Sequence, residues 1–487
     1  MKVLASVGGY MRVSAAAVLF SVGVAASAPV SAQLTPRTTN LKTAPCELTI
    51  RPEVQPRVSC YRLTVPRRYD DRSRGTYELA VFVRRAETPV PGRAPVLWLH
   101  GGPGSGVGAR ALNTDYPFFP GADVVYFASR GSYPSQPQPC RDLDQKQALA
   151  LVGKLSFAER RARYLAPHLE CRRRLDALNI QTDEFGTSLN TEDIERLRRA
   201  LGVEQWNVWA NSYGTGSAYD LLFRYPRSVR AALLSSPISL IATGAIFLRR
   251  DAKYIKRLAE YCRVDAACAV AFPDLQASVA RARSSLVGQP IVTRPFPAPF
   301  DSADVVLDET LFDTVLSELI NNAPSLPKIP RFIRAVLERD VTHIAEITRP
   351  LGARLGGLNV FGHTAFKCRD LPQFSPDPLV EVRPACPTWG LRGPPIRVPR
   401  RVQTPVLLLT GELDNNTPPE HGAAAQRLMG RRARHVNIPT VSHGPYGYNA
   451  CAREIAHAFF ERPEAPLDTS CLTTIPPLRF DLARAGS

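Results

Sequence analysis

The sequence predicts an α/β fold in which a mostly parallel sheet with flanking helices is interrupted by a helical insertion. Short apolar runs rich in β-branched residues alternate with helical stretches, as expected for parallel strands joined by crossover helices. This pattern stops at residue 238 and returns at residue 401, and one tight turn joins a strand directly to a helix. The predicted strands cover residues 77–83, 95–100, 123–129, 206–211, 231–237, 405–411 and 434–439.

The N-terminus has the three regions of a secretory signal. Lys2 and Arg12 precede an apolar stretch that ends in Ala-Pro-Val-Ser-Ala-Gln, and we expect cleavage after Ala32. Translation from Met11 would give a shorter signal of the same kind, and an uncleaved membrane anchor is the alternative. No interior stretch approaches the roughly 20 apolar residues of a membrane span, so we expect a secreted or periplasmic protein without stable membrane insertion.

The change in pattern along the chain suggests four parts. We expect a signal peptide at 1–32, a first part of the α/β core at 33–237, a helical cap insertion at 238–400 and a second part of the core at 401–487. A proline-rich stretch at 289–300 interrupts the helical patterns of the insertion.

The cysteines predict disulfides, because an even number of them in an exported chain suggests an oxidised framework. They fall into successive close couples, and we expect them to pair in that order, although spacing alone leaves other pairings open. A metal site is disfavoured because the chain has no Cys-x-x-Cys and no histidine at ligand spacing beside a cysteine. The ten residues are Cys46, Cys60, Cys140, Cys171, Cys262, Cys268, Cys368, Cys386, Cys451 and Cys471.

The net charge of +17 suggests an acidic partner such as nucleic acid, but the pattern argues against one. The arginines are scattered through helical stretches and lack the interleaved aromatic residues that a stacking surface needs. We therefore expect solvated helix faces and no nucleic-acid partner.

A helix, a strand, a sharp turn and a second helix follow one another in the middle of the first part. Asn190 is the predicted cap of the first helix, and Gly202 is its predicted end. The strand 206–211 comes next, and the second helix closes at Pro226.

The turn at residues 210–214 has the sequence Ala-Asn-Ser-Tyr-Gly, with small residues two positions before and after Ser212. A serine on a tight turn between strand and helix, flanked in this way, is typical of a nucleophile elbow. We expect Ser212 to be a nucleophile, with Ala210 where glycine is more usual.

Serine needs a base to remove its proton, and that base needs an acid to orient it. After such an elbow the acid and then the histidine follow along the chain. Asp414 lies just beyond the carboxyl end of a predicted strand, and Glu412 is a rival closer to that strand. His443, in the loop after the last predicted strand, is the expected base. His435 lies within that strand, and His421 lies in the helix after the acid.

The glycine-rich loop at residues 96–106, with the sequence VLWLHGGPGSG, requires an explanation because glycine costs conformational entropy on folding. Acyl transfer needs two backbone N–H groups that stabilise a negatively charged oxygen. We expect one from Tyr213 and the other from Gly102, with Gly101 as second choice, and the glycines would let a substrate approach this backbone. No Gly-Lys-Ser/Thr follows, and the Gly-x-Gly-x-x-Gly spacing is absent, which argues against phosphate-loop and dinucleotide sites.

At these residues the chain resembles the α/β-hydrolase family of proline iminopeptidases and secreted tripeptidyl aminopeptidases, which are serine exopeptidases. Their signature pairs His-Gly-Gly-Pro-Gly, here residues 100–104, with a Ser-Tyr-Gly-Thr elbow, here 212–215. The resemblance extends from about Cys46 to Cys471. This chain departs from the family's Asp-Gln-Arg-Gly at residues 128–131, a segment we expect near the active-site entrance.

The resemblance implies an α/β-hydrolase fold with a cap over Ser212, and a secreted aminopeptidase that needs no metal or organic cofactor. A carboxylesterase acting on small esters through the same triad is the alternative, and an inactive hydrolase-fold binding protein is a third. In these peptidases carboxylates of the cap hold the free α-amino group. The insertion offers Asp251, Glu260, Asp265, Asp274, Asp304, Asp308, Glu309, Asp313 and Glu318.

Overall fold

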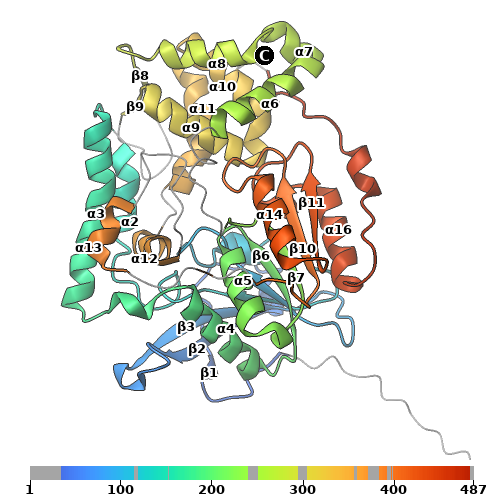
Figure 1. The fold of residues 1–487 in the computed structure, drawn as a ribbon. Coiled ribbons are helices and arrows are strands. Elements are labelled where there is room, and N and C mark those ends of the chain that lie inside the picture. The colour runs from blue at the N-terminus through green and yellow to red at the C-terminus, as the bar shows by residue number, and fades with distance from the viewer. Residues whose placement is uncertain are drawn as a thin grey trace, which may run out of the picture.

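A computed structural model gives the fold of most of the chain (Figure 1). It describes residues 34–114, 119–151, 153–239, 250–293, 304–355, 359–370, 383–391, 396 and 399–482. The predicted signal peptide and its cleavage site after Ala32 lie outside the described residues.

A nine-stranded sheet runs through the molecule in the order β1-β2-β3-β5-β4-β6-β7-β10-β11. The strands from β5 to β11 pair in parallel, whereas β1, β2 and β3 are antiparallel additions at one edge. The strands are β1 Leu41–Thr43, β2 Val58–Pro66, β3 Thr76–Arg84, β4 Val96–Leu99, β5 Val124–Phe127, β6 Trp206–Asn211, β7 Val229–Ser235, β10 Val406–Gly411 and β11 Ala433–Ile438. All seven predicted strands are present, and the predicted mostly parallel sheet is confirmed.

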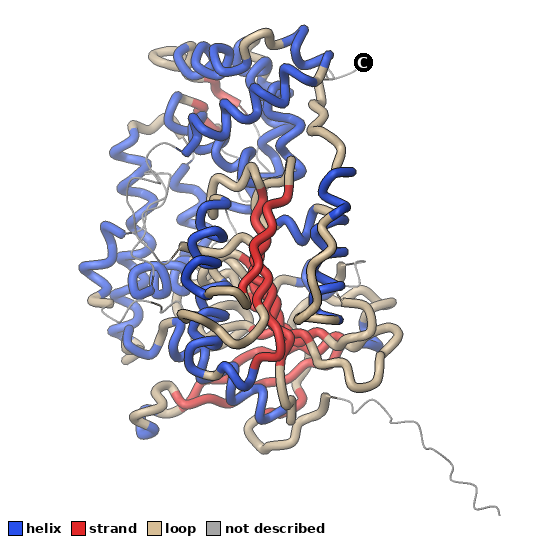
Figure 2. Tube along the Cα trace, turned by 45° about the vertical axis from the view of Figure 1, so that its right-hand side comes forward, coloured by secondary structure: helices blue, strands red, loops and turns tan. Residues whose placement is uncertain are grey.

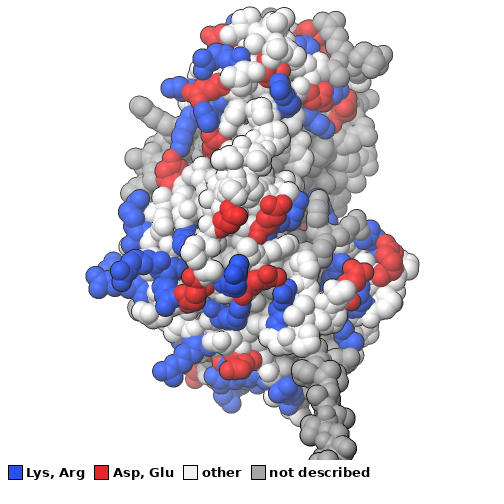
Figure 3. Space-filling model, turned by 90° about the vertical axis from the view of Figure 1, so that its right-hand side faces the viewer, with Lys and Arg blue, Asp and Glu red and all other residues white. Residues whose placement is uncertain are grey.

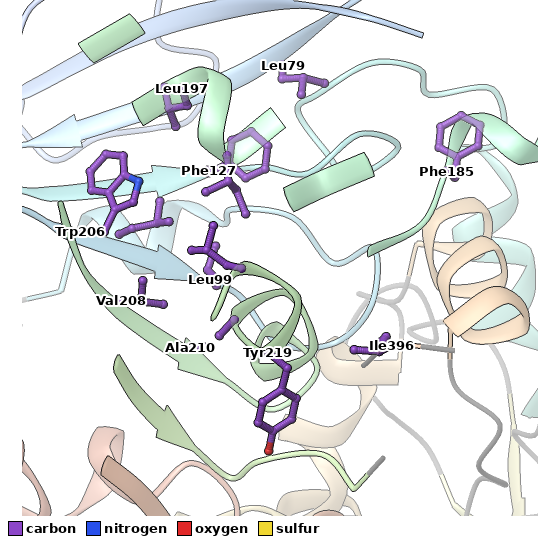
Figure 4. Close-up of a cluster of buried hydrophobic side chains, with 14 of the residues drawn as sticks. Leu79, Leu99, Phe127, Phe185, Leu197, Trp206, Val208, Ala210, Tyr219 and Ile396 are labelled. Carbon is purple, nitrogen blue, oxygen red and sulfur yellow. The ribbon is translucent and has the colours of Figure 1, made fainter. Parts of the chain in front are cut away.

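Helices cover both faces of the twisted sheet, so its central strands are buried on both sides (Figure 2). Side chains alternate across β6, with Trp206, Val208 and Ala210 in one apolar cluster and Trp209 in the cluster on the opposite face. Figure 4 shows the first cluster, where Leu99 lies beside these residues. The helices of this part are α1 Ala109–Leu112, α2 Leu143–Ala148, α3 Phe157–Ala177, α4 Thr187–Leu201, α5 Gly214–Arg224, α14 Pro419–Met429, α15 Pro445–Tyr448 and α16 Ala450–Glu461.

Helix α4 begins earlier than the sequence predicts. Its first residue is Thr187 and its N-cap is Gly186, so Asn190 lies inside the first turn and the predicted cap is wrong. The reason is a tertiary contact, because the Thr187 N–H donates to the carboxylate of Asp370 at 2.7 Å. The predicted end is confirmed, since Gly202 takes the left-handed conformation with φ of +64°.

The chain between β7 and β10 forms mainly helices (Figure 1). Those up to residue 355 build an apolar cluster of their own, whereas Val360, Phe361 and Trp389 belong to the cluster on one face of the sheet. The proline-rich stretch contributes a short strand, β8, that pairs antiparallel with β9. The elements are α6 Arg250–Val264, α7 Ala266–Ala271, α8 Leu275–Ser284, β8 Ile291–Thr293, β9 Val305–Leu307, α9 Glu309–Asn321, α10 Ile329–Leu337, α11 Val341–Leu355, α12 Val360–Asp370 and α13 Cys386–Trp389.

Two segments outside 238–400 pack with this insertion. The Trp389 indole N–H donates to the carbonyl of His168 on α3 at 3.0 Å. The C-terminal segment returns to the insertion, where the Asp481 N–H donates to the carbonyl of Pro327 at 2.9 Å. The insertion therefore packs as one unit with residues outside 238–400, and the expected boundaries describe only the order of the chain.

Five disulfides join the cysteines as neighbours along the chain, which is the order we predicted. They are Cys46–Cys60, Cys140–Cys171, Cys262–Cys268, Cys368–Cys386 and Cys451–Cys471.

Some arginines lie on a surface of mixed charge, and others are buried in ion pairs. Figure 3 shows basic and acidic residues interspersed over one face of the molecule. Arg174 pairs with Asp142 on the surface, as expected for a solvated helix. Arg160 differs from that expectation because it is fully buried and pairs with Asp308 at 2.7 Å. Within the described ranges, no helix is long and apolar enough to cross a membrane.

A buried ion pair joins the loop after β5 to α4. The Arg130 guanidinium donates to both carboxylate oxygens of Asp193, at 2.6 and 2.8 Å, and both side chains are fully buried. Tyr69 donates a further hydrogen bond to Asp193 at 2.8 Å. Arg130 therefore lies inside the core, whereas Ser129 of the same segment lines a small pocket together with Gly102 and Tyr213. Our expectation that segment 128–131 lies at the active-site entrance stays a prediction.

We predict that Asp193→Ala lowers the free energy of unfolding by about 3–5 kcal/mol, because it leaves the Arg130 guanidinium buried without its counter-ion. Asp183→Ala is the matched control, since it removes a partly exposed partner of Arg68 and should cost less than about 1 kcal/mol. Urea unfolding of both variants checks this. Equal losses in the free energy of unfolding of the two variants would contradict a stabilising role of the buried pair.

Candidate active site

Ser212 occupies a tight turn between β6 and α5. Its φ of +54° lies in the left-handed region, which is strained for a residue with a side chain. Three hydrogen bonds hold the turn: the Ser212 N–H donates to the Ser235 carbonyl at 2.9 Å, and the Ser212 carbonyl accepts from the Thr215 N–H at 3.0 Å and hydroxyl at 2.6 Å. The strand-turn-helix expected around this serine is therefore present.

A small residue is required two positions after the serine because other backbone crowds this position. A Cβ on Gly214 would lie 2.2 Å from the carbonyl oxygen of Leu99, the last residue of β4, so only glycine fits. Ala210 is fully buried within the apolar cluster of this face, and its methyl group is accommodated there.

The loop after β4 lies directly on this turn. A Cβ on Gly101 would be 2.8 Å from the Ser212 Cβ and 3.0 Å from the Asn211 carbonyl oxygen. Gly102 follows with φ of +56°. The structure therefore places the two predicted oxyanion segments side by side. One is the glycine loop, and the other is the start of α5.

Two other glycines of the loop are packed closely against backbone of the protein itself. A Cβ on Gly106 would lie 1.9 Å from the Tyr133 carbonyl oxygen, and one on Gly104 would lie 2.5 Å from the Gly362 carbonyl carbon. Our expectation that the glycines admit a substrate is therefore too broad, because internal packing alone requires glycine at these two positions.

Asp414 is fully buried in the turn after β10, where four donors surround its carboxylate. One oxygen accepts the backbone N–H groups of Asn416 at 2.9 Å and Thr417 at 2.8 Å. The other accepts the hydroxyls of Thr417 at 2.7 Å and Ser236 at 2.8 Å.

His443 Nδ1 lies 2.9 Å from the second carboxylate oxygen of Asp414. A carboxylate at Nδ1 keeps the proton on that nitrogen and leaves Nε2 free to accept one. Burial alone would raise the pKa of Asp414, but the charge and hydrogen bond of His443, together with the Thr417 donors, outweigh it and lower that pKa. The acid is therefore held ionised beside the imidazole.

The loop that carries His443 lies beside the serine turn. A Cβ on Gly444 would be 3.6 Å from the side-chain oxygen of Asn211, the residue before Ser212. The Gly444 N–H also donates to the Ser236 hydroxyl at 2.8 Å. The predicted nucleophile, base and acid thus come from three neighbouring segments at the carboxyl edge of the sheet.

Two family models match this sequence, one described as alpha/beta hydrolase fold over residues 94–270 and one described as TAP-like protein over residues 372–471. The first match includes the glycine loop and the serine turn, and the second includes Asp414 and His443. The chain belongs to the α/β-hydrolase family. The resemblance of its glycine loop and serine turn to those of tripeptidyl aminopeptidases and proline iminopeptidases agrees with the second match.

One similar protein is YuaR of Escherichia coli (strain K12), whose name describes it as a hydrolase. It is 27% identical over 194 residues, which are 38% of this chain and 37% of YuaR. The alignment therefore spans little more than a third of that relative.

Solved structures of other proteins align with most of this α/β-hydrolase, but their TM-scores are low. A proline iminopeptidase of Mycobacterium smegmatis is 16% identical with a TM-score of 0.38, covering 82% of this chain and 98% of its own. A thermophilic esterase of Thermogutta terrifontis is 13% identical with a TM-score of 0.36, covering 83% and 99%. Scores at this level carry no argument about substrate.

The rival acid and bases of this α/β-hydrolase lie in other environments. Glu412 accepts from Arg257 of α6 at 2.6 Å and from the hydroxyl of Tyr261, so it joins the sheet to the insertion. His435 Nε2 lies 2.7 Å from the Thr410 hydroxyl in the sheet, and burial lowers its pKa. His421 is buried in α14.

Ser236 and Thr417 are site residues that the sequence interpretation missed. Ser236 has φ of +50°, and its hydroxyl joins the acid to the histidine loop. Its position at the carboxyl end of a predicted strand was the available signal. Thr417, three residues after the acid, places its hydroxyl 3.1 Å from His443 Nδ1.

Several of the carboxylates proposed for amine binding have structural partners. Asp265, Asp274 and Asp308 cap helices α7, α8 and α9. Glu260 pairs with Arg257, and Asp313 pairs with Arg283. Among the residues with described positions, no group of three or more His, Cys, Asp or Glu side chains could hold a metal ion.

We predict that Gly101→Ala slows the reaction of Ser212 with a fluorophosphonate probe by at least about 10²-fold, because the new methyl group displaces the loop from the turn. Gly108→Ala is the matched control, since nothing lies within 4 Å of a Cβ there. Labelling rates and melting temperatures of both variants check this. Normal labelling of Gly101→Ala would contradict the tight contact.

We also predict that Asp414 contributes to acid sensitivity. The pKa of its carboxyl is lowered by folding, so its stabilisation is present above the unfolded value of about 3.9 and is lost as pH falls through the lower folded value. The stability difference between wild type and Asp414→Asn should therefore shrink below about pH 4. Urea unfolding at pH 3 and pH 7 measures it, and a pH-independent difference would refute this linkage.

Proposed function

We propose that this protein is an exported serine hydrolase, an aminopeptidase that removes N-terminal residues from peptides. The observation that carries the proposal is the 2.9 Å contact between His443 and the buried carboxylate of Asp414, next to a serine turn covered by a glycine loop. Such an arrangement serves acyl transfer through a covalent intermediate.

In the proposed reaction, the Ser212 hydroxyl attacks the substrate carbonyl carbon while His443 Nε2 takes its proton. Asp414 stabilises the imidazolium that forms. The carbonyl oxygen becomes negative and accepts hydrogen bonds from the N–H of Tyr213 and from Gly102 or Gly101 of the loop. His443 then protonates the leaving amine, the C–N bond breaks, and water releases the acyl group from Ser212 by the reverse sequence.

The peptidase assignment is supported by the TAP-like match at residues 372–471 and by the family resemblance of the glycine loop and elbow. The insertion between β7 and β10 would serve as the cap that selects substrates. Export is supported by the N-terminal signal pattern and by the five disulfides, which form in oxidising compartments.

We predict that a fluorophosphonate probe labels the wild type and not Ser212→Ala, because only an activated serine attacks the probe. Ser217→Ala, which removes another buried serine hydroxyl from the same turn-helix unit, is the matched control and should label normally. Mass spectrometry of the labelled peptide locates the adduct. Absence of labelling on folded wild type would favour an inactive binding protein.

The substrate class is tested with matched substrates. We predict cleavage of peptidyl anilides with a free α-amino group and little cleavage of the same peptides after N-acetylation, because an aminopeptidase recognises the amine. Release of the aniline chromophore gives the rates, with short-chain aryl esters assayed in parallel. Equal cleavage of free and acetylated peptides would refute aminopeptidase specificity, and cleavage of esters alone would identify a carboxylesterase.

A further inference from the structure

Helix α12 of the insertion is seated on the glycine loop. A Cβ on Gly362, in its first turn, would lie 2.6 Å from the Gly104 Cα and 3.0 Å from the Gly131 carbonyl oxygen. A Cβ on Gly104 would in turn lie 2.5 Å from the Gly362 carbonyl carbon. Backbone therefore meets backbone at this contact, and neither side leaves space for a side chain.

The other end of α12 is bonded to the serine turn. Asp370, its last residue, is 4% exposed, and one carboxylate oxygen accepts the Tyr213 hydroxyl at 3.2 Å. The same oxygen accepts the Thr187 N–H at 2.7 Å and hydroxyl at 2.6 Å, and that hydroxyl lies 2.7 Å from the Tyr213 hydroxyl. Phe366 packs on the Tyr213 ring with centroids 5.7 Å apart.

The helix is held firmly at both ends. The Asn359 side-chain oxygen accepts the Gly362 N–H at 2.6 Å and so caps the first turn. The Cys368–Cys386 disulfide joins the last turn to the segment that begins α13. An α-helix of this length spans roughly 16 Å as one rigid rod.

We propose that α12 sets the spacing between the two oxyanion donors, and that Asp370 is a positioning residue that holds Tyr213 in place. The Tyr213 N–H and the loop donor belong to segments more than a hundred residues apart in the chain, and α12 contacts both. This inference rests on the proposed function, because it concerns the oxyanion hole of that reaction. It gives the insertion a role in the chemistry itself, in addition to covering the site.

The physical basis is the sensitivity of oxyanion stabilisation to geometry. The two donors must point at an oxygen that becomes charged only during reaction, and a misplacement of about 1 Å can cost about 10²-fold in rate. Loss of the Asp370 contact frees the Tyr213 ring at one end of α12. The expected effect is therefore on turnover and not on binding of the substrate.

The test compares four variants by kcat and KM, on whichever anilide or ester the wild type cleaves. We predict that Asp370→Ala and Tyr213→Phe each lower kcat by roughly 10- to 100-fold with KM little changed. Asp370→Asn keeps an acceptor oxygen and should restore most of the rate. Thr364→Val is the matched control, because it removes a buried hydroxyl from α12 that contacts His168 and the Val360 carbonyl. It should lower stability while leaving kcat within a few-fold of wild type.

The double variant Asp370→Ala with Tyr213→Phe should be no slower than the slower single variant, because both remove one shared contact. Tyr213→Phe deletes a single hydroxyl, so it keeps the test available if Asp370→Ala does not fold. If wild type turns over but Asp370→Ala and Tyr213→Phe match Thr364→Val, the positioning role is wrong and the proposed function stands. If folded wild type cleaves none of the substrates, the proposed function and this inference both fail.

Discussion

The close approach of two backbone segments, the glycine loop after β4 and the serine turn after β6, is the constraint on which the site depends. These strands are parallel neighbours, so their carboxyl ends emerge side by side. Gly101 and Gly214 have no room for a side chain, because a Cβ on either would lie within 3 Å of the facing segment. Ser212 is thereby fixed in a left-handed conformation under a loop whose N–H groups have few positions available. The chemistry we propose requires such a preformed arrangement, since donors that had to move during reaction would lose most of their effect.

Neighbouring strands supply the remaining groups by the same principle. Ser236 follows β7, Asp414 follows β10 and His443 follows β11, and the Ser236 hydroxyl connects the acid to the histidine loop. The insertion adds α12, which reaches the glycine loop at one end and the Tyr213 side chain at the other. The candidate site is therefore built from six segments that are distant in sequence, and each contributes one or two contacts that the others cannot replace.

Local patterns were sufficient to predict the central strands, the elbow and the end of α4 at Gly202, because each depends on residues close together in sequence. The pairing of Asp414 with His443 was predictable from chain order once the elbow was recognised, and the contact between them agrees with that interpretation. The start of α4 was not predictable, since the acceptor for the Thr187 N–H is Asp370, far along the chain. The role of Asp370 could not be predicted for the same reason, because an aspartate carries no local signal for a partner that only the folded chain brings near. Ser236 offered only its position at the carboxyl end of a predicted strand, which does not identify its partners.

The most direct measurement of the central claim is a crystal structure of the protein after reaction with a fluorophosphonate. Our account predicts phosphorus bonded to Ser212 Oγ, with its free oxygen within hydrogen-bond distance of the Tyr213 N–H and of an N–H from Gly102 or Gly101, and His443 Nε2 facing the adduct. An adduct on another residue, or a phosphonyl oxygen directed away from both backbone donors, would contradict it.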